Sequence, residues 1–564
     1  KPATSYRWLG NIKKYQITPT GEIRDVNGNA AVDPNNGFFR DGAQSYWSDM
    51  ADGADAEMGG AAGELKNPAT RKIYSNLTAN SGTLTEDLSA LKASGNLTLA
   101  NLLLLGVVSN VAVSGRPAVG DLVDWAYGHD VQDDNGNSDF TEARKDMGDP
   151  LHSRPATVIY GGPADDPDIT LYATTNDGYV QAINAKTGAE LWAFVPRLML
   201  DRIEELYTND DVTSRVYGLD GAVRVVRLDR DGDGTIEPAG SDINGDGTVS
   251  ESEMDKVYLY FGMRRGGSSY VGLDVTVRTA PKLLWIIGPS DLPGVGQTWS
   301  APTVARVNVN RTWTSGNPDK MVLVFGGGYD VAQDTVGYVA DNVGNRVFMV
   351  DAITGSLIWR AGPTSDTGAQ LPLAKMTNSI PGDVRVVDLS GDGFADRMYA
   401  ADMGGRVWRF DIRNGQAAAD LVWGGVFASL GNGDLAVKTD ATKNRRFFYA
   451  PDVSLIDAGT TNFINIGIGS GHREKPITDV TVVNRFYSLR DFNVFSQVQN
   501  TQYKATCGTS ETSPCHQIIT DGDTRLLDVT GVANPTIPAG GVGWRMNLQD
   551  AGEKVLAESR TFQS

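Results

Sequence analysis

The chain has 564 residues, 40% of them hydrophobic, and a formal net charge of −19 at pH 7. That hydrophobic content is enough for a large buried core, which argues against a disordered chain. The negative charge argues against a nucleic-acid partner, because phosphates repel it and no stripe of Lys or Arg compensates. The 65 glycines, with 11 tryptophans and 19 tyrosines, favour many short strands joined by tight turns.

The ends of the sequence and its apolar runs bear on targeting. Because the sequence begins at Lys1 and not at methionine, we expect a fragment or a processed product whose signal peptide is not visible. The longest apolar run, Leu102–Val108, is short and interrupted, so no membrane span is predicted. The segment from Gly543 is typical of a hairpin close to the end of the sequence, which leaves open that the native protein continues.

A short repeat recurs along the chain and predicts its architecture. Residues 178–192 align without a gap on residues 345–359, and residues 405–415 fit the same frame. Residues 10–16 match its first half, and residues 269–285 are a stretched copy. The clearest copies are typical of an alternating strand, an Asp/Asn-x-x-Thr/Asn-Gly turn and a second strand ending on an aromatic residue. Since one hairpin cannot bury its own apolar face, we expect the copies to share the core of a β-propeller.

Two insertions make the spacing of the repeat irregular. Residues 76–149 are expected to be partly helical, because Thr85 begins a capping-style pattern and Leu122–Ala126 has helical spacing. Residues 227–256 contain two runs of alternating oxygen-bearing side chains, which is the rhythm of a calcium-binding loop. Inserted loops commonly carry binding, so residues 76–149 and the loop between Cys507 and Cys515 are candidate contact surfaces.

The second run in residues 227–256 has the full EF-hand calcium pattern. Oxygen-bearing side chains stand at positions 1, 3, 5 and 9, glycine at position 6, a carbonyl donor at position 7 and glutamate at position 12. Short side chains at odd positions point inward on a tightly turning backbone, and the glutamate supplies two oxygens at once. The predicted calcium ligands are Asp242, Asn244, Asp246, Thr248, Ser250 and Glu253.

The first run repeats positions 1 to 9, but Gly240 stands where the bidentate acid is expected. Its predicted ligands are Asp229, Asp231, Asp233, Thr235 and Glu237. A third run, at residues 388–396, has the same rhythm within nine residues. A solvated Gly/Asp turn without metal is the alternative for all three runs, and it is preferred for the weaker series Asp133, Asn135, Asn137 and Asp139.

Only two cysteines occur, Cys507 and Cys515, and they bracket a polar, turn-rich loop. This arrangement predicts a local disulfide, which would place the protein outside the cytoplasm. Two free surface thiols are the alternative. Millimolar calcium outside cells is consistent with an extracytoplasmic location.

Several phrases together resemble the C-terminal domain of the PilY family, the large tip-associated adhesins of type IV pili. They occur in family order at Leu122–Ala126, Gly148–Pro155, Asp396–Asp411, Gly469–Arg473, Arg485–Asp491 and Gly543–Trp544. The resemblance implies an all-β fold, a modified seven-bladed quinoprotein-like β-propeller that spans residues 1–564 as one domain. It also implies a calcium loop just before the strand at Tyr399–Asp402, with ligands from Asp388, Ser390, Asp392, the carbonyl of Phe394, and Asp396. Ser390 departs from the stronger Asp or Asn ligand that is common at its position.

The resemblance implies a calcium-binding pilus-tip protein that supports pilus biogenesis, calcium-regulated extension and retraction in twitching motility, and surface adhesion. The expected location is the bacterial cell surface or pilus tip, reached by export through the periplasm. Expected partners are minor pilins of the tip or other pilus machinery, and a host or abiotic surface is the candidate target of adhesion. As a mechanism, we expect calcium to relieve repulsion among the carboxylates of residues 388–396 and so to order the strand at Tyr399–Asp402.

Two other functions stay open. Quinone-dependent dehydrogenases share this propeller type and use calcium, but they resemble one another in a ring of vicinal cysteines, and Cys507 and Cys515 are not adjacent. A metal saturated by loop oxygens cannot polarise a substrate, and the four histidines lack ligand spacing, so an enzyme is not predicted. His152 and His472 are expected to have structural hydrogen-bonding roles. The other alternative is a periplasmic scaffold propeller that only organises partners.

Overall fold

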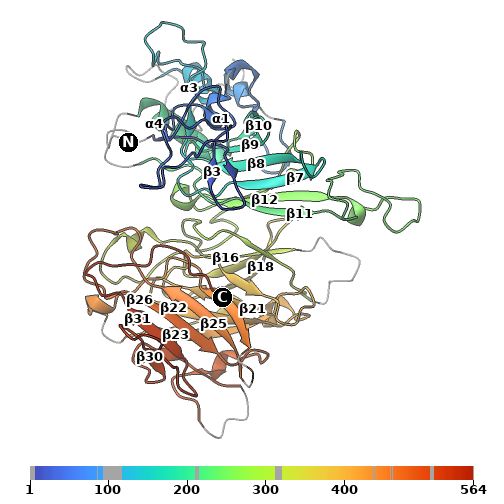
Figure 1. The fold of residues 1–564 in the computed structure, drawn as a ribbon. Helices are drawn as coiled ribbons and strands as arrows, with labels where there is room; N and C mark the ends of the chain where they lie inside the picture. Colours follow the sequence, from blue (N-terminus) through green and yellow to red (C-terminus); the bar gives the residue numbers. More distant parts are fainter. Residues whose placement is uncertain are drawn as a thin grey trace. The chain divides into compact units, whose positions relative to one another are not determined.

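The computed structural model describes residues 7–65, 67–85, 87–92, 117–209, 215–310, 321–435, 438–457, 459, 461–508 and 514–562. The chain divides into two compact units (Figure 1). Unit 1 comprises Lys1–Gly266 and Val271–Ile286, and unit 2 comprises Gly267–Tyr270 and Ile287–Ser564. The prediction that residues 1–564 are one propeller domain stays a prediction.

Unit 1 contains two five-stranded sheets. The first has the order β4 (Ile73–Tyr74), β10 (Glu190–Phe194), β9 (Val180–Asn184), β8 (Asp168–Thr174) and β7 (Ala156–Gly161). The second has the order β11 (Arg224–Leu228), β12 (Lys256–Gly262), β13 (Tyr270–Asp274), β14 (Lys282–Ile287) and β5 (Gly82–Thr83). Neighbouring long strands are antiparallel and follow one another in the chain, which is the meander expected of a propeller blade.

Unit 2 contains three further five-stranded sheets. The first has the order β15 (Thr303–Ala305), β16 (Val322–Gly326), β17 (Val347–Asp351), β18 (Leu357–Gly362) and β19 (Leu371–Pro372). The next has β20 (Arg385–Val387), β21 (Arg397–Ala401), β22 (Arg406–Ile412), β23 (Val422–Ser429) and β29 (Ile519–Thr520). The last has β24 (Asp452–Asp457), β25 (Asn462–Gly469), β26 (Arg485–Asp491), β31 (Gly543–Asn547) and β30 (Leu526–Asp528).

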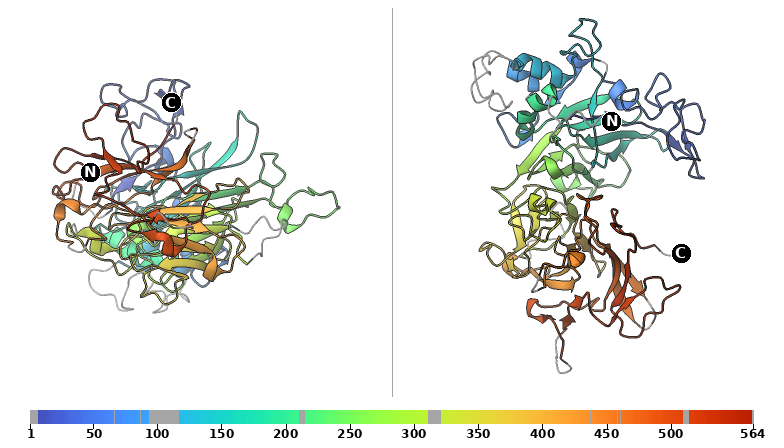
Figure 2. Two further views of the ribbon diagram at one scale, coloured as in Figure 1. Left: turned by 90° about the horizontal axis from the view of Figure 1, so that it is seen from below. Right: turned by 90° about the vertical axis from the view of Figure 1, so that its left-hand side faces the viewer.

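Smaller elements accompany these sheets, and Figure 2 gives two further views of the ribbon. Three two-stranded pairs join β1 (Leu9–Gly10) to β6 (Met147–Gly148), β2 (Gln16–Ile17) to β3 (Ile23–Arg24), and β27 (Tyr503–Lys504) to β28 (His516–Gln517). The α-helices of the described residues are α1 (Gly60–Gly63), α3 (Val119–Tyr127) and α4 (Ile203–Thr208). Helix α3 contains Leu122–Ala126 and buries Leu122, Val123 and Trp125, whereas residues 93–116 of the same insertion, with the apolar run Leu102–Val108, lie outside the described residues.

The repeat forms the inner hairpins of these sheets. In the copy at residues 178–192, strands β9 and β10 are joined by a turn in which the Asn184 side chain accepts from the N–H groups of Lys186 and Thr187. In the copy at residues 345–359, Asp351 accepts from Ile353 and Thr354 in the same way. The aromatic residue that closes each copy, Trp192 or Trp359, is fully buried. Each of these two copies therefore combines a hydrogen-bonded turn, which sets the strand register, with a tryptophan that packs in the core.

The all-β propeller prediction is confirmed, and the described residues contain five sheets with blade topology where the resemblance implies seven. The predicted disulfide is also confirmed: Cys507 and Cys515 are bonded, with their Cα atoms 6.1 Å apart, and the alternative of two free thiols is wrong. No helix in the described ranges is long and apolar enough to cross a membrane.

Candidate metal centres

Two hairpins carry all the predicted metal ligands, and each joins the first two strands of a blade. Strands β11 and β12 pair as far as Leu228 and Lys256, so residues 229–255 form the connecting loop. Strands β20 and β21 pair as far as Val387 and Arg397, so residues 388–396 form the other. The longer loop extends well beyond its strands in Figures 1 and 2. Both loops begin and end with an aspartate. The first aspartate follows the last paired residue of one strand, and the second precedes the first paired residue of the next strand.

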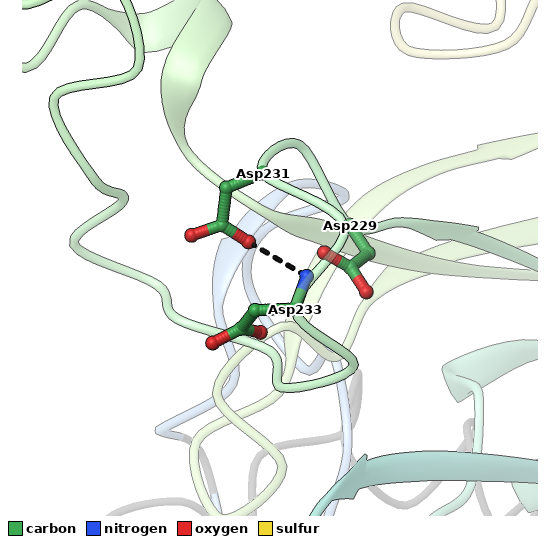
Figure 3. Close-up of side chains that lie close together, drawn as sticks. All are labelled: Asp229, Asp231 and Asp233. Atoms are coloured by element: carbon green, nitrogen blue, oxygen red, sulfur yellow. Dashed lines mark hydrogen bonds between the residues drawn. The ribbon is translucent and has the colours of Figure 1, made fainter.

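The long loop begins with a cluster of three carboxylates (Figure 3). Asp229, Asp231 and Asp233 each place a carboxylate oxygen within 4.8 Å of the other two. The N–H of Asp233 donates to Asp231 Oδ1 at 3.2 Å, which turns the backbone tightly between these side chains. Among the described residues, this is the one group of three or more acid, histidine or cysteine side chains that is close enough to hold a metal ion.

Gly240 supplies no side chain at the twelfth position, and the carboxylate that bonds the backbone of this first run is Asp255, the last residue of the loop. Asp255 is only 2% exposed, and its Oδ1 accepts from the N–H of Arg230, the second residue of the loop, at 2.8 Å. Its Oδ2 accepts from the N–H of Glu237, the ninth residue, at 2.8 Å. Linear spacing could not reveal this residue, because eighteen residues separate it from Glu237 along the chain.

The run at Asp242–Glu253 lies inside this long loop and closes on itself. Glu253 Oε1 accepts from the N–H groups of Ile243 and Asn244, and its Oε2 accepts from the N–H of Ser250 at 2.8 Å. Glu253 therefore bonds positions 2 and 9 of its run, as Asp255 bonds positions 2 and 9 of the first. A 3-10 turn at Glu251–Glu253 with a capping box holds this glutamate in place.

The short loop reproduces the same arrangement in nine residues. Asp396 Oδ2 accepts from the N–H groups of Leu389 and Ser390, each at 2.8 Å. Asp388 accepts from the N–H groups of Gly391 and Gly393 at 2.7 and 2.8 Å. Asp229 makes the equivalent bonds to Gly232 and Gly234 at 2.8 and 3.0 Å. Asp255 and Asp396 are thus each the last residue of a loop and accept from the N–H of its second residue, while Asp255 also bonds the ninth residue and Asp396 the third.

Glycine at positions 4 and 6 allows all three runs to turn. Gly232, Gly245 and Gly391 have φ between +73° and +75°, a left-handed conformation that residues with a Cβ rarely adopt. The position-6 glycines are also left-handed, with φ of +92° at Gly234 and +87° at Gly393. This turn directs the backbone N–H groups of the loop toward the first aspartate.

The eighth residue ties each hairpin loop to the preceding sheet. The N–H of Ile236 donates to the carbonyl of Tyr160, at the outer strand β7, at 3.0 Å. The N–H of Ala395 donates to the carbonyl of Arg306, directly after the outer strand β15, at 2.8 Å. Both side chains are buried. Each loop is therefore attached to the preceding sheet as well as to its own strands.

Three carboxylates of the loops, those of Asp388, Asp229 and Glu253, have lowered pKa values. Burial raises the pKa of Asp388, but hydrogen bonds from the N–H groups of Gly393 and Gly391 outweigh it, so the net pKa is lowered. The pKa of Asp229 is lowered in the same way, against burial, by Gly232 and Gly234, and Arg227 contributes an ion pair at 3.1 Å. A hydrogen bond from the Ser250 hydroxyl lowers the pKa of Glu253. These oxygens are negatively charged at neutral pH and available to a cation.

The remaining candidate ligands take part in the loops less directly. Glu237 accepts from the hydroxyl of Ser241 at 2.8 Å. The N–H groups of Thr235, Thr248 and Phe394 each donate to the aspartate two residues earlier. The series Asp133 to Asp139 forms turns in which the Asn135 and Asn137 side chains accept from nearby backbone N–H groups.

The histidines serve the packing of the sheets. His152 pairs through Nδ1 with the buried carboxylate of Asp220 at 2.5 Å. His472 is buried and lies within 3.1 Å of the Gln333 carbonyl, Asp479 and Arg446. Burial lowers the pKa of His472. These contacts agree with the structural role that the sequence indicates.

Comparison with known proteins places this geometry in context. Residues 161–424 match the family profile described as the PilY1 beta-propeller domain. The chain is 27% identical over 296 residues to the type IV pilus biogenesis factor PilY1 of Pseudomonas aeruginosa, which covers 48% of this chain and 21% of the relative. A PilY1 homolog of Xylella fastidiosa is 28% identical over 241 residues, covering 43% of this chain and 16% of the relative.

Among solved structures, the C-terminal domain of Pseudomonas aeruginosa PilY1 aligns with a TM-score of 0.44 and 20% identity, covering 69% of this chain and 74% of that domain. The chain spans about a fifth of the length of the curated relatives it matches. Those relatives are named as pilus biogenesis factors.

Proposed function

We propose that the chain, whose residues 161–424 match the PilY1 beta-propeller profile, is a calcium-binding propeller of a type IV pilus protein of that family. The single observation that carries the calcium proposal is the shared loop geometry. Two hairpins in different blades are 27 and nine residues long. In both, the first aspartate accepts from the N–H groups of positions 4 and 6, and the last aspartate accepts from the N–H of position 2.

The donor set fits calcium. Calcium takes six to eight oxygen ligands from carboxylates and carbonyls in flexible geometry. Asp229, Asp231, Asp233 and Asp255 offer carboxylates in the first loop. Asp388, Asp392 and Asp396, with the hydroxyl of Ser390, offer the oxygens of the short loop. The run at residues 242–253, which lies inside the long loop and is called the nested loop, offers oxygens from Asp242, Asn244, Asp246 and Glu253. No nitrogen or sulfur donor stands among them, which disfavours zinc or copper.

Metal at the short loop would stabilise a strand that carries a buried ionic network. Asp396 is followed by Arg397, whose Nε donates to Asp411 Oδ1 at 2.6 Å. Two residues further on, the Tyr399 hydroxyl donates to Asp491 Oδ2 at 2.6 Å. Neutralising the loop carboxylates removes repulsion at the start of this strand. We propose that occupancy of this loop regulates the order of strand β21.

Calcium titration of metal-stripped protein by calorimetry tests the proposal. Extracellular sites of this type bind at roughly 0.1–1 mM, and we expect at least two events in or near that range. Asp388→Ala removes one event and Asp229→Ala another, while Asp133→Ala, in a turn outside these loops, changes neither. Absence of any heat of binding, with the protein folded by circular dichroism, contradicts the proposal.

The biological role follows from the family and is proposed for the whole protein. We propose that it acts at the cell surface or pilus tip, after export through the periplasm, with minor pilins or other pilus machinery as partners. Pilus biogenesis, twitching motility and surface adhesion are the processes it would support. No catalytic role is proposed.

Complementation of a deletion strain tests that role. Twitching that is restored by the native gene, but lost or made insensitive to calcium by Asp388→Ala, supports a regulated pilus protein. Normal piliation and twitching in the deletion strain would contradict a role in the pilus and favour the alternative, a periplasmic scaffold.

A further inference from the structure

A cavity of about 480 Å³ lies where strands β23 and β29 end in unit 2. These two strands are parallel neighbours, paired at Ala428 with Ile519 and at Ser429 with Thr520. The apolar part of the wall comes from Leu430, Leu435, Ala505 and Ile518. The volume is in the range of cavities that hold small organic ligands. None of its lining residues belongs to the metal loops.

Three cations and two carboxylates also line the cavity, in a chain whose overall charge is strongly negative. The cations are Lys375, Lys443 and Arg445, and the carboxylates are Asp434 and Asp521. Asp434 already accepts from Lys375 at 2.7 Å and from Arg406 at 2.8 Å. Its negative charge is therefore neutralised by the protein itself.

Asp521 is outnumbered by guanidinium groups. Its Oδ2 accepts from Arg445 at 3.2 Å, and its Oδ1 accepts from Arg485 and from the Tyr487 hydroxyl. Arg545 donates to its backbone carbonyl. One carboxylate thus faces three arginines, and Arg545 also lies 3.5 Å from Asp528, so this side of the cavity keeps an excess of positive charge. Lys443 pairs with Asp440 at 3.1 Å, and both of these side chains are exposed.

Arg445 holds part of this charge in a fixed place. Its side chain is 2% exposed, its Nε donates to the Val483 carbonyl at 2.8 Å, and its Nη1 donates to the Leu430 carbonyl at 3.0 Å. Among the described residues, no hydrogen bond uses its Nη2. A buried guanidinium held by three bonds, with one nitrogen left over, is a preorganised donor for an anion.

We propose that this cavity binds a carboxylate attached to an apolar group. The carboxylate pairs with Arg445 and Lys443, and the apolar group lies against Leu430 and Ile518. A highly charged anion such as phosphate would leave the apolar wall uncovered, and a neutral apolar ligand would leave the cations unused. Free small carboxylic acids and the carboxyl terminus of a peptide with an apolar last residue share this chemistry.

Calorimetric titration with four probes tests the proposal and distinguishes the two sources. The probes are 4-methylpentanoate, its neutral amide, an acetylated tripeptide ending in leucine, and the same tripeptide with an amidated end. We expect each acid to bind at least tenfold more tightly than its amide. Binding of the peptide acid alone assigns the site to chain ends, and binding of both acids shows that a small acid suffices.

Two variants locate the binding. Gly522 is exposed and lines the cavity, and a Cβ added there meets no atom within 4 Å, so Gly522→Trp places a large side chain at the cavity wall without a clash at its Cβ. We expect Gly522→Trp to abolish binding and Lys443→Gln to weaken it several-fold. Lys186→Gln, an exposed lysine in unit 1, is the matched control and leaves binding unchanged. Equal affinity for acid and amide, no binding of any probe at millimolar concentration, or unchanged binding in Gly522→Trp overturns the proposal.

Discussion

The two hairpin loops, residues 229–255 and residues 388–396, have the same hydrogen-bonded frame and very different lengths. In both, the first aspartate accepts from two glycine N–H groups, and the last aspartate accepts from the N–H of the second residue. The strand pair fixes the first and last residues opposite each other, whatever lies between them. Candidate metal sites in such blades are therefore defined by the hairpin and not by the linear spacing of the ligands.

The two loops differ in the burial of the charged residue that directly follows each of them. The residue after Asp396 is Arg397, which is 2% exposed and belongs to a buried network with Arg409, Asp411 and Asp491. The residue after Asp255 is Lys256, which is half-buried. The short loop thus borders charges that cannot reach water, whereas the long loop borders a lysine that can. We expect changes at the short loop to affect stability and changes at the long loop to remain local.

The largest expected effect comes from Arg397→Met. This change leaves Arg409 as the one guanidinium of the pair to balance Asp411 and Asp491, which are both fully buried. Breaking a buried ion pair from one side costs about 3–5 kcal/mol. Urea denaturation followed by tryptophan fluorescence measures the free energy of unfolding. Lys256→Met is the matched control and shifts it by less than about 0.5 kcal/mol; equal effects of the two changes would remove the distinction between the loops.

The closing aspartates give the next largest effect. Asp255→Ala and Asp396→Ala should each weaken calcium binding at their own loop by at least tenfold, or about 1.4 kcal/mol. Glu237→Ala, at the position that linear spacing favours, should weaken the first loop less than Asp255→Ala does. Calorimetry on each variant measures both events. If Glu237→Ala abolished binding and Asp255→Ala did not, the equivalence of Asp255 and Asp396 would be wrong.

Much of the fold could be predicted from the sequence, because its signals are local. The Asp/Asn-x-x-Thr-Gly turns and closing tryptophans specify the hairpins β9–β10 and β17–β18 within about fifteen residues. The disulfide is local as well, since eight positions separate its cysteines. Asp255 could not be found, because its role depends on strand pairing between β11 and β12. The cavity at Arg445 could not be found either, since its lining comes from segments more than a hundred residues apart.

Shortening the long loop tests whether the hairpin alone defines the site. Deleting residues 237–254 joins Ile236 to Asp255 and leaves nine residues, as in the short loop. Reducing a loop from 27 to nine residues lowers the closure cost by (3/2)RT ln 3, about 1 kcal/mol. We expect a folded protein, slightly more stable in denaturation, that loses the nested event and keeps the calcium event of Asp229 and Asp255. Loss of both events would show that the inserted residues are needed for the first site.

The smallest effect comes from exchanging the third residues of the loops. Asp231 and Ser390 occupy the same position, so positions 1, 3 and 5 together with the closing aspartate supply four carboxylates in the first loop and three in the short loop. Arg227 pairs with Asp229 at 3.1 Å, whereas Val386 holds the same place beside Asp388, so the extra carboxylate of the first loop is offset by a cation. Ser390→Asp adds a charged ligand without such an offset and should tighten calcium binding at the short loop several-fold. Asp231→Ser leaves Arg227 opposed by fewer acids and should weaken the first loop by a similar factor. Calorimetry on the native protein and both variants separates the effect of this cation from the effect of the number of carboxylate ligands. If the number of ligands alone decided calcium affinity, the native first loop would already bind calcium more tightly than the native short loop.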